Sequence, residues 1–168
     1  MRIRKIVCVI IALLTLCGCG SIDSSVLNYA EHAFCADVEG QVDGIDFSAR
    51  VQVSSADENG ARSIRMEFSS PENLCGIVVT KDAEGTSISL DGINISDAAA
   101  QGWLVIAQLL VPEGQVVSIK NSEQGTATVA LDSKQIIVID LNTGAPLEVS
   151  LDGARSVFVR VTRFESGE

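Results

Sequence analysis

Apolar and polar residues alternate along most of this chain, in short runs separated by turn-forming dipeptides. The clearest run is 45–53, in which five apolar residues alternate with Asp, Ser, Arg and Gln. A period of two is the pattern of a strand with one buried and one solvated face. Comparable runs recur about every ten residues with no helices between them, which predicts an antiparallel sheet. The predicted strands cover 35–42, 45–53, 64–68, 74–80, 87–90, 116–120, 126–131, 135–141, 147–151 and 156–165.

One segment, Asp97–Pro112, breaks this pattern and predicts a helix between the two groups of strands. Asp97 can cap its start, three alanines favour a helical first turn, and Pro112 stops it. From Trp103 to Val111 only Gln108 is polar. A helix that is apolar nearly all round has to be buried or has to cover an apolar surface. We therefore expect this helix to plug a curved sheet. Helical spacing at residues 26–33 predicts a shorter helix at the start of the domain.

The first twenty residues predict export. Arg2, Arg4 and Lys5 precede an apolar stretch of 11 residues, Ile6–Leu16, which is too short to span a bilayer comfortably. The sequence Leu16-Cys17-Gly18-Cys19 that follows resembles the lipobox of bacterial lipoproteins. The resemblance implies cleavage before Cys19 and a diacylglycerol on that cysteine.

The predicted organisation is a signal peptide at 1–18, a lipidated cysteine with a short tether at 19–25, and a single β-rich domain at 26–168. Two acyl chains give stable anchoring. The lipobox resemblance thus places the protein in the cell envelope, on the outer face of the cell membrane, or at the outer membrane of a Gram-negative host.

The charge of the chain limits which partners it can bind, and its cysteines limit which disulfides it can form. The formal net charge is -10, and loss of the basic leader makes it more negative. Nucleic acid is an unsuitable partner, because phosphate binding needs clustered Lys and Arg. In the exported domain Cys35 and Cys75 remain. Either they form a disulfide that closes a loop of about 40 residues, worth roughly 3–4 kcal/mol in the chain-entropy model, or they are two free thiols.

The sequence contains no arrangement that predicts catalysis. No G-x-S-x-G, H-E-x-x-H, P-loop or C-x-x-C motif occurs. The only histidine is His32, so neither a Ser-His-Asp triad nor a multi-histidine metal site can be assembled readily. We predict a protein without enzymatic activity, without catalytic or metal-ligating residues, and with no cofactor beyond the covalent lipid on Cys19.

The layout of a short helix, about five strands, an apolar helix and about five more strands is similar to that of the half-barrel family of outer-membrane lipoprotein carriers (LolA/LolB-like). The segment Phe68–Gly76 looks like the F-x-x-P-x-x-L-x-G stretch of many of those proteins. The resemblance implies a mostly β (α+β) fold: a curved antiparallel sheet, or half-barrel, of about ten strands with one or two helices on a concave face that accepts acyl chains.

Two functions follow from this layout. In the first, the protein holds an apolar ligand, such as an acyl chain or lipid, between the sheet and the helix. Its candidate lining residues are Phe47, Met66, Phe68, Trp103, Ile106 and Leu110. In the second, these residues form an ordinary packed core, and the domain is an interaction or sensor module that docks on another envelope protein.

Overall fold

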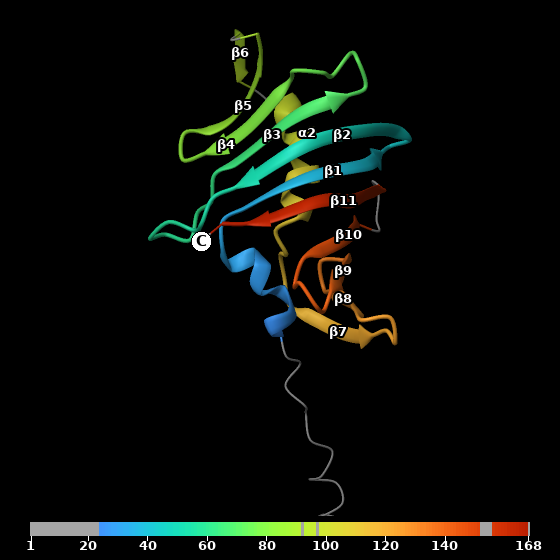
Figure 1. Cartoon of the computed structure of the whole chain (residues 1–168). Coiled ribbons are helices and arrows are strands. Elements are labelled where there is room, and N and C mark those ends of the chain that lie inside the picture. Colours follow the sequence, from blue (N-terminus) through green and yellow to red (C-terminus); the bar gives the residue numbers. More distant parts are fainter. Residues whose placement is uncertain (1–23, 92, 97, 152–155, 168) are drawn as a thin grey trace, which may run out of the picture.

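The computed structural model describes residues 24–91, 93–96, 98–151 and 156–167. Eleven strands of these residues form one antiparallel sheet in the order β6-β5-β4-β3-β2-β1-β11-β10-β9-β8-β7 (Figure 1). The strands are β1 Phe34–Val42, β2 Ile45–Val53, β3 Ile64–Ser70, β4 Val78–Asp82, β5 Gly85–Leu90, β6 Ile93–Ser96, β7 Val116–Asn121, β8 Thr126–Leu131, β9 Gln135–Asp140, β10 Pro146–Leu151 and β11 Val157–Ser166.

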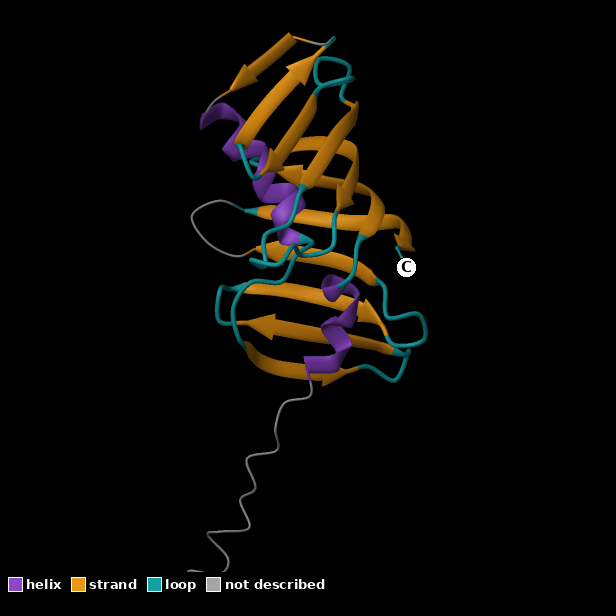
Figure 2. Ribbon diagram, turned by 90° about the vertical axis from the view of Figure 1, so that its left-hand side faces the viewer, coloured by secondary structure: helices purple, strands orange, loops and turns teal. Residues whose placement is uncertain are grey.

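The sheet is a half-barrel, as predicted. Its order ends at β6 on one side and β7 on the other, and these two strands do not pair with each other in the part of the chain described. Neighbouring strands of the sheet are consecutive in the chain except at the centre, where the first strand of the domain, β1, pairs with the last, β11. The termini of the domain therefore meet in the middle of the sheet, and the strands on each side form a meander. Figure 2 shows the sheet curving as one continuous layer.

The alternating sequence pattern produces one buried and one exposed face. In β2 the side chains of Phe47, Ala49, Val51 and Val53 are buried, whereas those between them are exposed or half-buried. The buried faces of the other long strands join the same core. Because residues two apart lie on one face of a strand, this periodicity places the buried side chains together on one face of the sheet.

The long apolar helix, α2 (Ala98–Leu109), lies across this concave face. It contacts β3, β4 and β5 on one side of the sheet and β10 on the other. Leu104, Ile106 and Leu110 are at most 3% exposed. The helix predicted at 97–112 is confirmed, although it ends before Pro112, and Asp97, its predicted cap, lies outside the described residues.

The first helix, η1 (Ser24–Glu31), is a 3-10 helix that covers the end of β1 and β11. Tyr29 contacts Phe34 of β1 and Phe164 of β11 through ring edges, with centroids 5.9 and 5.8 Å away. The short helix predicted from the spacing of apolar residues at 26–33 is thus present. It starts at Ser24, inside the segment that was expected to be a tether.

The strand predicted at 74–80 is wrong in its first half. Residues 72–76 form turns: the N–H of Leu74 donates to the carbonyl of Pro71 at 2.9 Å, and that of Gly76 to the carbonyl of Phe68 at 2.9 Å. Gly76 has a φ of 81°, which favours glycine. Strand β4 begins only at Val78. Apolar content alone misled the prediction, because the local chain reversal after Ser70 overrides it.

Candidate functional site

Three aromatic residues meet between the sheet and α2. Phe47 of β2 and Phe68 of β3 lie on the concave face, with ring centroids 6.2 Å apart and planes at 77°. Trp103, in the first half of α2, meets Phe68 edge to face with centroids 5.2 Å apart. Such edge contacts are favoured by the quadrupoles of the rings. The helix is thus positioned on β3 by its single tryptophan.

The structure brings all six predicted lining residues into one cluster. Five of them are at most 2% exposed, and Trp103 is half-buried. Their burial means that the space between sheet and helix is filled by side chains in this conformation. A ligand could occupy it only if α2 moved or if these side chains changed rotamer. The ligand-lining role of Phe47, Met66, Phe68, Trp103, Ile106 and Leu110 stays a prediction.

One region of open space lies around the C-terminal end of α2, at one end of the half-barrel, which we call the mouth. Three hollows of about 550, 250 and 130 Å³ surround Val111 there. The largest lies between η1 and the segment that leads into β7. The second lies between the β2–β3 loop and the β4–β5 turn, and the smallest lies beside β9. None of the six predicted residues lines these hollows. Sequence patterns missed the mouth because its lining comes from loops and element ends.

Gln135 of β9 holds the end of α2 at the mouth. It is 3% exposed, although its side chain is polar. Its side-chain amide donates to the backbone carbonyl of Leu109, and its oxygen accepts from the N–H of Glu113 at 3.3 Å. Carbonyls in the last turn of a helix have no partner within the helix. Gln135 therefore acts as a side-chain cap that fixes the helix end to the sheet.

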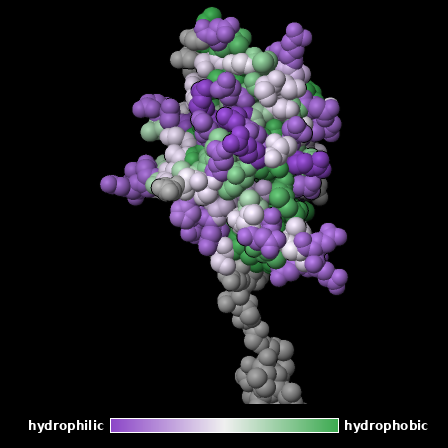
Figure 3. Space-filling view, viewed as in Figure 1, coloured by the Kyte–Doolittle hydropathy of each residue, from purple (hydrophilic) through white to green (hydrophobic). Residues whose placement is uncertain are grey.

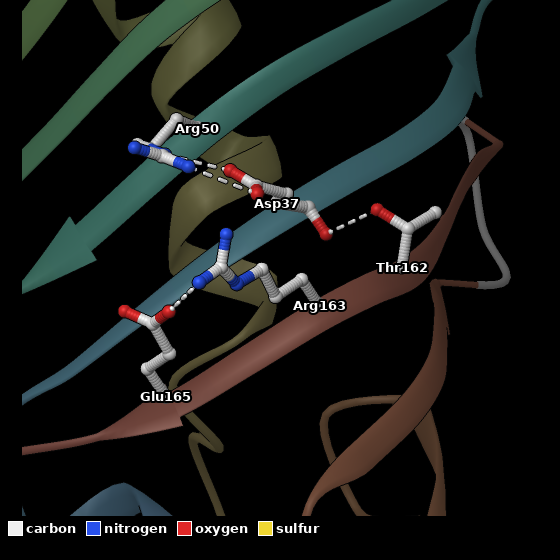
Figure 4. A network of polar contacts seen from close by, with 5 residues as sticks. All are labelled: Asp37, Arg50, Thr162, Arg163 and Glu165. Atoms are coloured by element: carbon white, nitrogen blue, oxygen red, sulfur yellow. Dashed lines mark hydrogen bonds and ion pairs between the residues drawn. The ribbon is translucent and has the colours of Figure 1, made fainter.

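The convex face carries many charged side chains, with apolar patches beside them (Figure 3). Asp37 of β1 accepts two hydrogen bonds from Arg50 of β2, at 2.7 and 3.0 Å, and Thr162 of β11 donates to the backbone carbonyl of Asp37 (Figure 4). The hydrogen bond from Arg50 lowers the pKa of Asp37. The register of β11 against β1 shifts at this point, so Thr162 is an extra residue in a β-bulge. This network joins the three central strands but leaves no group free for chemistry.

Both cysteines are free thiols in the structure, the second of the two alternatives that the sequence left open, so no disulfide joins Cys35 and Cys75. Cys35 pairs with Gln52, and Gln52 pairs with Arg65 near the start of β3. Cys75 follows the far end of β3. A strand advances about 3.3 Å per residue, and a disulfide requires Cα atoms within about 7 Å. The lengths of β2 and β3 thus keep the two thiols apart. Burial raises the pKa of Cys35.

The described residues hold no group of three or more His, Cys, Asp or Glu side chains that could bind a metal ion. His32 is exposed, and its carbonyl accepts a hydrogen bond from Arg62. In the same part of the chain, neither helix has the length and apolar character needed to cross a membrane. The predicted lipidation residue, Cys19, lies outside the described residues.

An open, curved antiparallel sheet with helices on its concave face defines a half-barrel, which is the architecture that the sequence resemblance implied. No family model matches the chain, and no curated protein matches it in sequence.

One solved structure shows a likeness in fold at a TM-score above 0.5, and others align less closely. The crystal structure of an uncharacterized conserved protein from Thermus thermophilus aligns with a TM-score of 0.52 at 16% identity, over 86% of each chain. A LolA superfamily protein from Nitrosomonas europaea aligns with a TM-score of 0.45 at 7% identity, over 86% of this chain and 93% of that one. MucB aligns with a TM-score of 0.48 at 15% identity, over 89% of this chain and 60% of MucB. At 16% identity the likeness to the Thermus thermophilus protein concerns the fold alone.

Proposed function

We propose that this protein is a non-enzymatic lipoprotein of the cell envelope that holds an apolar ligand, an acyl chain or lipid, between its curved sheet and α2. One observation carries the proposal: an apolar helix lies across a concave face that is itself apolar, next to open hollows at the mouth. The helix end is fixed there by the side chain of Gln135. Displacing such a helix exposes apolar surface, and an acyl chain replaces the lost burial.

The envelope location rests on the leader and the lipobox-like Leu16–Cys19. A diacylated Cys19 would lie five residues before η1, so the domain would sit close to the membrane that supplies acyl ligands. The strong negative charge of the chain argues against binding to an anionic membrane surface through the domain itself.

A second function remains in competition, in which the domain is an interaction module for another envelope protein. The closed packing of the six predicted lining residues favours it, because a core without space needs no ligand. Phe158 of β11 and Ile136 of β9, which are 39% and 38% exposed, would then belong to the contact surface on the convex face.

The single tryptophan distinguishes these functions, because Trp103 lies inside the proposed site. A bromine atom quenches indole fluorescence only at contact. The full chain in neutral phosphatidylcholine nanodiscs is titrated with dibromostearic acid, and the fluorescence of Trp103 is followed. Saturable quenching supports the ligand proposal.

A matched reporter controls for non-specific quenching. In the double variant Trp103→Phe, Phe158→Trp, the indole lies on the convex face, and we expect no saturable quenching there. If Trp103 is not quenched, or if both reporters respond equally, the ligand proposal is wrong. Cross-linking of the anchored protein in membranes then becomes the test of the interaction module.

A further inference from the structure

The arginines of this protein fall into two groups. Four of the five that the structure describes form ion pairs on the sheet surface. These pairs are Arg50–Asp37, Arg65–Glu67, Arg160–Glu148 and Arg163–Glu165. All four of these arginines are exposed. Arg62 differs on both counts: it is half-buried, and no carboxylate among the described residues lies within ion-pair distance of it.

Arg62 is held in place by a neutral group. It precedes β3, and its Nη1 donates to the backbone carbonyl of His32 at 3.3 Å. A guanidinium carries five N–H donors in a planar fork that matches a carboxylate. This contact uses one of them and orients the side chain toward the mouth, where Arg62 lines both the 550 Å³ and the 250 Å³ hollow.

A second unpaired cation lines the smaller of these two hollows. Lys81, near the end of β4, is also half-buried, whereas Lys120 and Lys134 are exposed. In the described part of the chain, Lys81 forms no ion pair. The two half-buried cations of an acidic protein thus border one hollow of about 250 Å³.

Among the described residues, the acidic residues around the mouth form no ion pair with these cations. Glu31, Asp82 and Glu113 line the same hollows and are exposed to solvent. The Oδ1 atom of Asp82 accepts from the backbone N–H groups of Glu84 and Gly85, at 3.0 and 3.2 Å, so it is engaged in its own turn. Cations that are partly desolvated and unpaired bind an anion more strongly than solvated ones do.

Apolar side chains continue from the cations toward the core. The hollow beside Arg62 and Lys81 is also lined by Val111 and by Ile64, which is 5% exposed and belongs to the core of the half-barrel. Leu110, which adjoins Val111 in the chain, is fully buried under the sheet. Charged groups at the rim and apolar groups beyond them fit a ligand with an anionic end and an apolar tail.

We propose that Arg62 and Lys81 bind the carboxylate of a single-chain fatty acid, whose tail passes Ile64 and Val111 into the space between the sheet and α2. This inference rests on the function proposed above and specifies the ligand class. It assigns the carboxylate to the mouth and gives the two cations the role of selecting an acid over a neutral lipid of the same length.

The test compares two probes that differ only at the head, dibromostearic acid and dibromostearyl alcohol, by quenching of Trp103 in the full chain in phosphatidylcholine nanodiscs. The pH is set so that the carboxylate is ionised. In the unsubstituted protein we expect tighter binding of the acid. In the variant Arg62→Gln, Lys81→Gln we expect the apparent Kd of the acid to rise about tenfold or more, the range given by loss of a charged hydrogen bond. The Kd of the alcohol should stay within about twofold.

Two further variants sharpen the comparison. Lys120→Gln, Lys134→Gln removes the same charge from exposed positions, and acid binding should be retained. Arg62→Lys keeps the charge and should retain most of the preference for the acid. The emission of unliganded Trp103 checks that each variant is folded.

The outcomes separate the two proposals. The role of Arg62 and Lys81 is overturned if acid and alcohol quench Trp103 equally. It is also overturned if both double-glutamine variants lose acid binding to the same extent. Either result leaves the ligand function intact. If neither probe quenches Trp103, both proposals are overturned. The assignment is supported if the preference for the acid is lost in Arg62→Gln, Lys81→Gln and kept in Lys120→Gln, Lys134→Gln.

Discussion

The side-chain amide of Gln135 donates a hydrogen bond to the backbone carbonyl of Leu109, and this contact joins strand β9 to the last turn of α2. The side chain is almost fully buried, and its oxygen also accepts from Glu113. One residue thus satisfies two backbone groups at the place where the helix leaves the concave face.

Replacing Gln135 with leucine should destabilise the protein, although it makes the core more apolar. The substitution leaves the carbonyl of Leu109 without its partner, and a buried unsatisfied group costs about 1–3 kcal/mol. We expect the free energy of unfolding to fall by this amount in urea titrations that follow Trp103 fluorescence. The control is Gln52→Leu, an exposed position on β2, which should change stability by no more than about 0.5 kcal/mol. Equal stability of Gln135→Leu and the unsubstituted protein would contradict the capping role.

Gly40 of β1 should tolerate no side chain. It pairs with Phe47 of β2 and Val159 of β11. A Cβ atom there would lie 2.1 Å from the carbonyl oxygen of Phe158 and 3.0 Å from two carbons of the Phe47 ring. Gly40→Ala therefore forces the central strands apart, and we expect a loss of about 1–3 kcal/mol, typical of overpacking.

The source of this strain can be tested with a second substitution. The closest atom belongs to the backbone of β11, so shortening the neighbouring ring does not relieve the clash. The variant Gly40→Ala, Phe47→Leu should thus be less stable than Phe47→Leu by about the same amount as Gly40→Ala is less stable than the unsubstituted protein. Recovery of stability in the double variant would show that the ring, and not the backbone of β11, limits the site.

Much of the fold could be predicted from the sequence because its strands bury one face only. The alternation in β2 and the turn-forming dipeptides between strands locate elements through local chemistry. The apolar segment of α2 is recognisable for the same reason. The prediction failed at residues 74–77, where apolar side chains lie in turns stabilised by backbone hydrogen bonds to Pro71 and Phe68. Such contacts depend on how the chain reverses and leave no periodic signal.

The candidate site was harder to predict than the fold. The six proposed lining residues do meet, because they share a face, but apolar periodicity cannot distinguish a cavity from a packed core. Arg62 and Lys81 come from different loops and strand ends, and their common feature is the absence of an ion-pair partner among the described residues. Only a three-dimensional structure shows this feature. Gln135 likewise reads as one polar residue in an apolar strand until the end of α2 is placed beside it.

Tyr29 offers the clearest pH-dependent prediction, because it is the single tyrosine of the chain. It is 6% exposed, and its hydroxyl has no hydrogen-bond partner among the residues that the structure describes. Burial raises its pKa above the ordinary value of 10.0. Above about pH 10 the unfolded chain loses this proton while the folded protein keeps it. The unfolded state is then favoured, so stability that is present below pH 10 falls as the pH rises, by up to about 1.4 kcal/mol per pH unit.

Tyr29→Phe should remove this dependence and leave the aromatic contacts with Phe34 and Phe164 in place. At neutral pH the variant should be as stable as the unsubstituted protein, or more stable by about 1 kcal/mol, since an unpaired buried hydroxyl opposes folding. Urea titrations of both proteins between pH 7 and 11 give the difference, in which the contributions of lysines cancel. Tyrosinate absorbance of the folded protein provides an independent readout of the same residue. A Tyr29→Phe variant that is less stable at pH 7 and loses stability equally steeply at high pH would show that the hydroxyl has a partner and titrates normally.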